Sequence, residues 1–362
     1  MNLTDIANIR LVSQQIAASK FKTPKDLVKW MGAMQAQDYA MAKWAIGLRL
    51  PGSTNKQVEA AIDKGTIIRT HLMRPTWHFV AAEDIYWMLE LTAPRIKAAL
   101  KSRHKELELT EKTFSKSTTV LEKALAGKKY LTREELMIEF TKSKIATHDN
   151  RSSHLMLRAE LDGIVCSGAT KNNKQTYALI AERIPNKKNF TKDEALATLA
   201  KKYFLSHCPA TIQDFAWWSG LPLTDARHAV EMIKRDFVSE KIGLQTYWTS
   251  NSFSIPEKSK SVYLLPAYDE FIISYKDRGA AFNAENLKRS ISNNGLFKPL
   301  IVINGEVTGL WKRTIRKDKV IVQIEFFRPY NKTSKKIIEK AALTYGLFLG
   351  KKIEMKDNNE YE

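Results

Sequence analysis

Residues 66–80, TIIRTHLMRPTWHFV, mark the point where the chain changes from helical to extended structure. Apolar side chains alternate on both sides of Met73 to Thr76, which is the period-2 pattern of two β-strands joined by a turn. Helical patterns precede this hairpin at residues 4–18, 24–34, 41–50 and 56–64. Helices followed by a two-stranded hairpin are the element order of a winged helix, and we predict one here.

The same order recurs twice further along the chain. In the second copy a capping box at residues 132–135 opens a helix, and strand patterns at 163–166 and 176–180 flank the basic turn KNNK. In the third copy a capping box at 191–194 leads to a helix–turn–helix with Gly220 in the turn. Strand-like segments then follow at 242–249 and 261–265, separated by a polar loop. We therefore predict three modules of one topology.

The composition becomes rich in β-patterns from about residue 296. Asn304-Gly305 predicts a hairpin turn, a last helix is expected at residues 334–347, and an acidic tail ends the chain. Together these patterns predict an α+β protein. We divide it into residues 1–110, 111–185, 186–290 and 291–362, that is, three tandem winged-helix modules and a C-terminal β-rich subdomain.

Charge indicates the class of partner. The 362 residues include 58 Lys and Arg against 39 Asp and Glu, which gives a net charge of +19 and a pI near 9.6. This excess indicates a polyanionic partner, with double-stranded DNA first and an anionic membrane well behind it. A basic protein that is only kept soluble by its charge remains an alternative. No apolar run approaches the ~18 residues of a membrane span, so no membrane association is expected.

The two cysteines argue against a metal or disulfide framework. Cys166 and Cys208 stand far apart and form no C-x-x-C motif, so neither zinc nor iron–sulfur binding is expected, and no cofactor. The N-terminus lacks the continuous apolar core of a signal peptide. A cytoplasmic protein associated with the nucleoid fits these features.

Polar residues interrupt the tightly patterned helices at Gln35-Ala36-Gln37-Asp38. Each glutamine offers both amide donors and a carbonyl acceptor. Residues two apart do not share a helix face, so both amides could converge on one site only where the backbone is irregular or extended. Asp38 has two interpretations: a general base, or the cap of the helix that follows.

The hairpin carries a second candidate group. With a turn at Met73 to Thr76, His71 and His78 become cross-strand partners on one face, and Arg69 lies two residues back on that face. Two histidines and an arginine there could grip a phosphate or a displaced nucleotide. A purely structural, hydrogen-bonded hairpin remains the alternative.

Six further cations lie on helices or turns of the second and third modules, where they could contact DNA phosphates without reading sequence: Arg151, Arg158, Lys171, Lys174, Arg227 and Lys234. The alternative for each residue is an ordinary solvated helix face. That alternative weakens when similar placement recurs in more than one module.

Five stretches together resemble the AlkZ family of winged-helix DNA glycosylases, the azinomycin-resistance type. They are MQAQD (34–38), RTHLMRPTWH (69–78), PATIQDFAWWSG (209–220), LPAYDE (265–270) and YKDR (275–278), and they follow the family's order across most of the chain. The resemblance implies three tandem winged helices in a C-shaped arrangement with a C-terminal β-barrel-like subdomain. Family members carry Gln-x-Gln or Gln-x-Asp at the first stretch, and this sequence has Gln-x-Gln.

The resemblance also implies roles for individual residues. Gln35 and Gln37 would be the catalytic pair, and the hairpin with Arg69, His71, Arg74 and His78 would lie near the lesion. Asp269 and Arg278 fall in matching stretches and are expected to form an ion pair that orders the junction to the C-terminal subdomain.

These features favour a monofunctional DNA glycosylase that removes N7- or N3-alkylated purines, including bulky or crosslinked ones, from damaged duplex DNA. A cationic alkylpurine is already a good leaving group, so neutral amides suffice to place a water and stabilise an oxocarbenium-like state. A non-catalytic winged-helix regulator or architectural factor is the alternative, and an RNA-binding or toxin-sequestering protein is a third. Three modules in one chain make dimerisation unnecessary, so a monomer is expected.

Overall fold

Two capped helices begin the N-terminal part of the chain. In the computed structural model, which describes residues 1–250, 261–292, 295–328 and 332–357, Thr23 Oγ1 accepts a hydrogen bond from the Asp26 N–H (3.1 Å) where α2 begins. Pro24 takes the first helical position, as the sequence predicts. The helices of this part are α1 (Leu3–Ser13), α2 (Pro24–Met31), α3 (Tyr39–Arg49), α4 (Asn55–Asp63), α5 (Ile85–Ala99) and α6 (Lys101–Glu106).

The predicted first hairpin is present, with one additional strand. β2 (Ile67–Leu72) and β3 (Thr76–Ala81) form an antiparallel pair, and β1 (Ala33–Gln35) lies on the other side of β3. Because β1 comes from the Gln-x-Gln stretch, the hairpin and the candidate catalytic residues belong to one sheet.

The predicted register of this hairpin is wrong by one residue. Leu72 pairs with Thr76, so the connection is Met73-Arg74-Pro75, and Met73 has a positive φ of 61°. His71 therefore lies opposite Trp77 and not opposite His78. Since side chains alternate along a strand, a one-residue shift sends the two histidines to opposite faces of the sheet.

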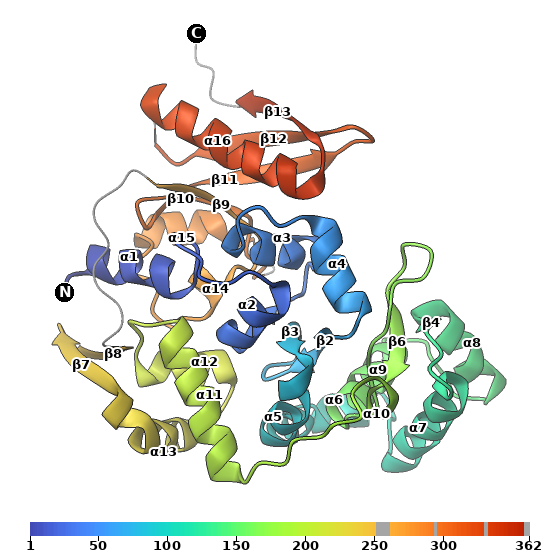
Figure 1. Cartoon of the computed structure of the whole chain (residues 1–362). Coiled ribbons are helices and arrows are strands. Elements are labelled where there is room, and N and C mark those ends of the chain that lie inside the picture. The colour runs from blue at the N-terminus through green and yellow to red at the C-terminus, as the bar shows by residue number, and fades with distance from the viewer. Residues whose placement is uncertain (251–260, 293–294, 329–331, 358–362) are drawn as a thin grey trace.

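The second part forms a separate lobe, seen at the right of Figure 1. Its elements are α7 (Glu111–Leu125), β4 (Leu131–Thr132), α8 (Arg133–Lys142), α9 (Arg151–Leu161), β5 (Val165–Ser167), β6 (Thr176–Leu179) and α10 (Ile180–Arg183). The strands are ordered β4-β6-β5, and a core that includes Phe114, Leu136 and Phe140 is fully enclosed by the lobe. The predicted capping box at Thr132 and Glu135 is confirmed.

The third part contains α11 (Lys192–Ser206), α12 (Ile212–Ser219), α13 (Leu223–Ile233) and the hairpin of β7 (Phe237–Ile242) and β8 (Gln245–Ser250). Gly220 ends α12 in the left-handed conformation, as its place in the predicted turn requires. The first predicted strand segment, 242–249, spans the turn between β7 and β8, which pair with each other. The second, 261–265, contains β9 (Val262–Leu265), which joins the C-terminal sheet. Most of the predicted polar loop, residues 251–260, lies outside the described residues, as does the acidic tail after Asp357.

The C-terminal sheet is five-stranded in the order β13-β12-β11-β10-β9, with α14 (Glu270–Ile273) and α15 (Ala284–Ser290) between β9 and β10. The remaining elements are β10 (Leu300–Ile303), β11 (Glu306–Ile315), β12 (Lys319–Phe326), α16 (Lys332–Leu349) and β13 (Lys352–Asp357). The predicted Asn304-Gly305 turn is confirmed, with φ values of 51° and 85°.

Apolar packing fixes the N-terminal part between its neighbours. One core joins α3 to the C-terminal sheet through Trp44, Trp311 and Tyr345, and another joins the first hairpin to α5 and α11–α13. β1 thus lies where the first, third and C-terminal parts meet, because Ala33 belongs to one of these cores and Met34 to the other. In the part of the chain that the structure describes, no helix combines the length and apolar character needed to cross a bilayer.

Candidate active site

The Gln-x-Gln stretch is extended at Gln35 and paired as far as Ala36, and Gln37 lies in the bend that leads into α3. Gln35 ends β1 opposite His78, and the next residue continues the pairing, because the Ala36 N–H donates to the Trp77 carbonyl oxygen at 2.6 Å. Gln35 is 9% exposed and Gln37 is exposed, so the pair runs from the interior to the surface.

Hydrogen bonds orient both side-chain carbonyls. An Arg74 Nη2–H donates to Gln35 Oε1 at 3.2 Å, and the Trp77 N–H faces Gln37 Oε1 at 3.4 Å. Arginine can only donate, so the oxygen of the Gln35 amide, and not its nitrogen, faces Arg74. Each carbonyl oxygen keeps a second lone pair that could accept from a water or face a positive charge.

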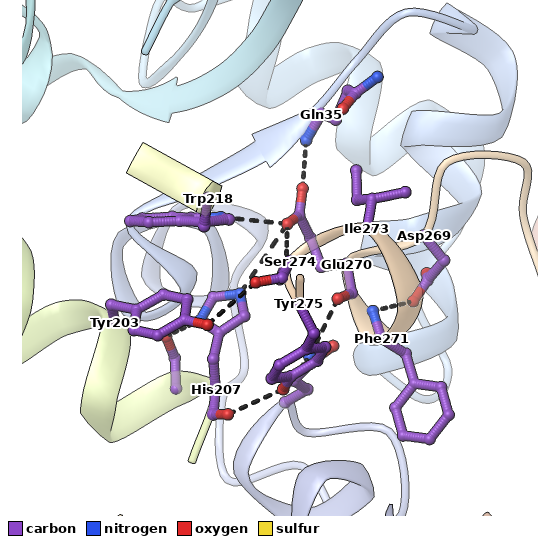
Figure 2. Close-up of polar contacts among 12 residues, drawn as sticks. Gln35, Tyr203, His207, Trp218, Asp269, Glu270, Phe271, Ile273, Ser274 and Tyr275 are labelled. Atoms are coloured by element: carbon purple, nitrogen blue, oxygen red, sulfur yellow. Dashed lines mark hydrogen bonds and ion pairs between the residues drawn. The ribbon is translucent and has the colours of Figure 1, made fainter. Parts of the chain in front are cut away.

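A buried carboxylate anchors this strand from below. Glu270 Oε1 accepts the Gln35 N–H at 2.6 Å, as Figure 2 shows. Glu270 Oε2 accepts from Trp218 Nε1–H at 3.2 Å and from the Ser274 hydroxyl, and it lies 3.9 Å from His207 Nε2. Burial raises the pKa of Glu270, while these donors and the Arg74 charge oppose the rise. Glu270 therefore holds β1 against both α12 and α14.

His207 completes the buried network as a neutral ring. Its ring stacks on Tyr203 with centroids 4.8 Å apart, and burial lowers its pKa well below the usual 6.5. The Ser206 hydroxyl already donates to the Lys202 carbonyl, so His207 Nδ1–H is the donor in the 2.7 Å contact with Ser206 Oγ. The lone pair of His207 Nε2 then faces Glu270.

The predicted ion pair between Asp269 and Arg278 is wrong. Asp269 instead forms a two-pronged pair with Arg49 at 2.7 and 2.8 Å, with both side chains fully buried, and Arg49 also donates to Gln14 Oε1. Arg278 follows α14 in the chain. Its Nε–H donates to the Ile272 carbonyl, and its guanidinium lies near the rings of Trp217 and Phe297. A lone arginine at the end of the apolar 41–50 helix was the available signal for a buried acidic partner.

Asp38 is the cap of α3. Its carboxylate accepts the Met41 N–H at 3.0 Å, and Arg313 lies 3.8 Å away. The cap interpretation of Asp38 is thus confirmed, and these contacts hold the carboxylate at the helix N-terminus.

The hairpin presents two faces. His78 lies on the Gln35 side, fully buried, with Nδ1 2.9 Å from the Thr76 carbonyl oxygen. Burial, together with the nearby Arg74, lowers the pKa of His78 to about 3, so the ring is neutral near pH 7. It therefore adds no positive charge beside Gln35.

The opposite face of the hairpin contacts the second lobe. His71 Nδ1 lies 2.6 Å from Glu160 Oε2, and the His71 and Arg69 side chains lie over Trp77 at 4.5 and 4.1 Å. Arg69 and Trp77 line a cavity of about 380 Å³ whose other lining residues come from the second lobe. The two histidines predicted to share a face therefore lie on opposite faces of the hairpin. His78 lies beside Gln35, and His71 contacts the second lobe.

Several residues predicted to contact DNA phosphates instead bind other groups of the protein. Arg158 forms a two-pronged pair with Glu111 and a further bond to Asp162, and Arg151 donates to the carbonyls of Leu107 and Ala146. Lys171, Lys174 and Lys234 pair with acidic residues on exposed surface, where such pairs are weak and exchangeable, and Arg227 is exposed on α13. No group of three His, Cys, Asp or Glu suited to a metal ion occurs among the described residues.

Comparison with known proteins gives the class of the protein. A family model described as DNA glycosylase AlkZ-like matches residues 28–348. The chain therefore belongs to the AlkZ-like family of DNA glycosylases, which are hydrolases of N-glycosyl bonds, and the family prediction from the sequence is confirmed.

Two matches, one to a curated sequence and one to a solved structure, come from Streptomyces sahachiroi. One, an interstrand DNA cross-link repair glycosylase, is 22% identical over 303 residues, which cover 79% of this chain and 81% of the relative. The other is the solved structure of the DNA glycosylase AlkZ, which aligns with a TM-score of 0.82 at 19% identity over 99% of each chain. This second similarity shows that the fold is shared.

Proposed function

We propose that the protein is a monofunctional glycosylase that hydrolyses the N-glycosidic bond of N7- or N3-alkylated purines in duplex DNA. The carrying observation is that Gln35 ends β1 and Gln37 follows in the bend before α3, with each carbonyl held by a donor. The name of the Streptomyces sahachiroi relative supports extending the substrates to bulky or crosslinked purines.

The chemistry needs little beyond oriented dipoles. An N7- or N3-alkylpurine carries a positive charge and leaves without strong protonation, so the enzyme needs to place a water and stabilise the cationic sugar. The carbonyl oxygens of Gln35 and Gln37 would accept from that water and face the developing charge. Removing one such oriented group costs on the order of 10²–10³ in rate in other enzymes.

Arg74 orients Gln35 but brings a positive charge close to a cationic transition state. Glu270 lies on the other side of Gln35 and carries the opposite charge, and both side chains are largely buried, where charges interact strongly. In this mechanism Glu270 is a positioning residue that holds the strand and balances Arg74. His78 would contribute as a neutral ring.

The DNA partner would be bound by three tandem winged helices, with β9 belonging to the C-terminal subdomain and not to the third module. Exposed cations at Arg227, Lys171, Lys174 and Lys234 would supply phosphate contacts, and the first hairpin would lie against the lesion. Arg158 and Arg151 would act mainly within the protein. A monomer acting on the cytoplasmic nucleoid fits this arrangement.

Release of 7-methylguanine from methylated duplex DNA tests the proposal, with wild type compared to the Gln35→Ala/Gln37→Ala double variant. Release by the wild type alone is expected. If the wild type released neither 7-methylguanine nor a crosslinked purine while still binding duplex tightly, the glycosylase proposal would fail and a non-catalytic DNA-binding protein would take its place.

A further inference from the structure

The indole of Trp217 is exposed although its neighbours in α12 are buried. Trp217 is 42% exposed, whereas Phe215 and Trp218 are fully buried on the inner side of the helix. Gln213 is exposed too, one turn earlier, and residues four apart share a helix face. Large aromatic side chains contribute most to stability when buried, so packing of the described chain does not account for an indole at this position.

Two arginines border this indole. The guanidinium carbons of Arg278 and Arg74 lie 5.5 and 5.9 Å from the ring centroid, within the range of cation–π contact. Trp217 Nε1–H donates to the Ile273 carbonyl at 3.0 Å, which fixes the ring against rotation. Trp217 is therefore a rigid aromatic surface with a positively charged border.

This surface is joined to the candidate catalytic residues by direct contacts. Arg74 both borders Trp217 and donates to Gln35 Oε1. The end of α12 is pressed against the hairpin loop, because a Cβ on Gly220 would lie only 2.7 Å from the Met73 carbonyl oxygen. A DNA strand that contacts Gln35 beside Arg74 would therefore lie close to Trp217.

We propose that Trp217 is a stacking platform for a nucleobase that leaves the duplex stack at the lesion, with Arg278 and Arg74 pairing with its flanking phosphates. An aromatic ring between arginines suits a base with an anionic backbone, since every base has a π-face and every linkage a negative charge. A cavity of about 470 Å³ begins at Arg278, and its lining includes Gln213 and Lys276, which gives the nucleotide polar space. The proposal rests on the proposed function.

The test uses DNA binding and base unstacking, not base release. Duplexes carry a tetrahydrofuran abasic-site analogue, with the fluorescent base 2-aminopurine placed in turn opposite and beside the analogue. The wild type should bind and raise the fluorescence at one of these positions, because an unstacked 2-aminopurine is brighter. Trp217→Ala should bind about tenfold to a hundredfold more weakly and lose the rise even at saturation, and Trp217→Phe should retain most of both.

Trp30→Ala provides a matched control. Trp30 is also partly exposed, its Nε1–H also donates to a backbone carbonyl (Ser13, 2.9 Å), and a cation, Lys20, lies over its ring. Its variant should bind and unstack DNA as the wild type does. An unchanged fluorescence rise with Trp217→Ala, or an equal loss with Trp30→Ala, would overturn the platform and leave the glycosylase proposal standing. A wild type that does not bind duplex DNA would overturn both.

Discussion

Replacing Glu270 with glutamine keeps the shape of the anchoring side chain and removes its charge. The carboxylate accepts from three donors, Gln35 N–H, Trp218 Nε1–H and the Ser274 hydroxyl. A glutamine has one acceptor oxygen, and its NH2 group must face one of these donors. The Ser274 hydroxyl can rotate to accept, but a buried N–H of Gln35 or Trp218 loses its partner.

The orientation of the new amide can be worked out from His207. The Nε2 lone pair of His207 lies on the Oε2 side, so an NH2 group placed there gains an acceptor, and the oxygen remains toward the Gln35 N–H. Strand β1 then stays anchored while the Trp218 N–H is left unpaired. An unsatisfied buried donor costs about 1–3 kcal/mol, so we expect Glu270→Gln to lower the free energy of unfolding by that amount.

The effect on rate comes from the charge of Arg74, which is no longer balanced. Glutamine at position 270 removes the negative charge that offsets Arg74. For a separation of about 8 Å between that charge and a cationic transition state, the loss costs roughly 2 kcal/mol at an effective dielectric constant near 20, or about thirtyfold in rate. Single-turnover release of 7-methylguanine measures that rate, DNA titration measures affinity, and urea unfolding measures stability. We expect a slower rate at nearly unchanged DNA affinity.

Glu182→Gln is the matched control. That carboxylate also accepts two backbone N–H groups, from Gly127 and Lys128, but it lies on exposed surface far from β1. It should leave the rate unchanged. A wild-type rate in Glu270→Gln would refute the balancing role, and a thirtyfold loss in Glu182→Gln would show that the assay responds to any lost carboxylate.

Three further outcomes are expected. Gln37→Ala should lower the rate of base release about 10²–10³-fold with DNA affinity within about twofold of wild type; a comparable loss of affinity would contradict a catalytic role. Arg49→Met should lower the free energy of unfolding in urea by about 3–5 kcal/mol, because buried Asp269 loses its partner, and Arg49→Met/Asp269→Leu should recover most of it. Folded His78 has a pKa of about 3 against a usual 6.5, so its contribution to stability is present above pH 6.5 and lost as pH falls. His78→Gln should therefore flatten the acidic part of the curve of unfolding free energy against pH. An unchanged curve would exclude this effect of burying His78.

The sequence predicted helix ends and turns correctly where the residues that determine them are close together in the chain. The Thr132 and Thr191 capping boxes, the glycine after α12 and the Asn304-Gly305 turn all depend on residues within one turn of each other, and all are confirmed. The hairpin register failed because it depends on whether three or four residues form the loop. The positive φ of Met73, an uncommon conformation for that residue type, decides it.

The predicted site failed where partners are distant in sequence. Glu270 binds the Gln35 N–H across 235 positions, and Arg49 meets Asp269 across 220, so neither pairing leaves a periodic signal. The Gln-x-Gln spacing did state the condition for convergence, an extended backbone, without revealing what would impose it. The pairing of β1 with β3 and the Glu270 carboxylate impose it together.

The position of the amide pair depends on contacts between segments that are distant in sequence. β1 has one edge on β3 of the first part, its last N–H is bound by α14, and Arg74 from the hairpin loop lies between Gln35 and α12. A neutral amide has no charge to hold it in place, so its carbonyl direction depends wholly on these neighbours. Three segments, β1, the first hairpin and α14, must therefore be packed before the Gln35 oxygen takes its direction. The catalytic geometry we propose thus depends on tertiary packing at the junction, and a substitution in α12 or α14 that never contacts DNA can slow the reaction by turning Gln35.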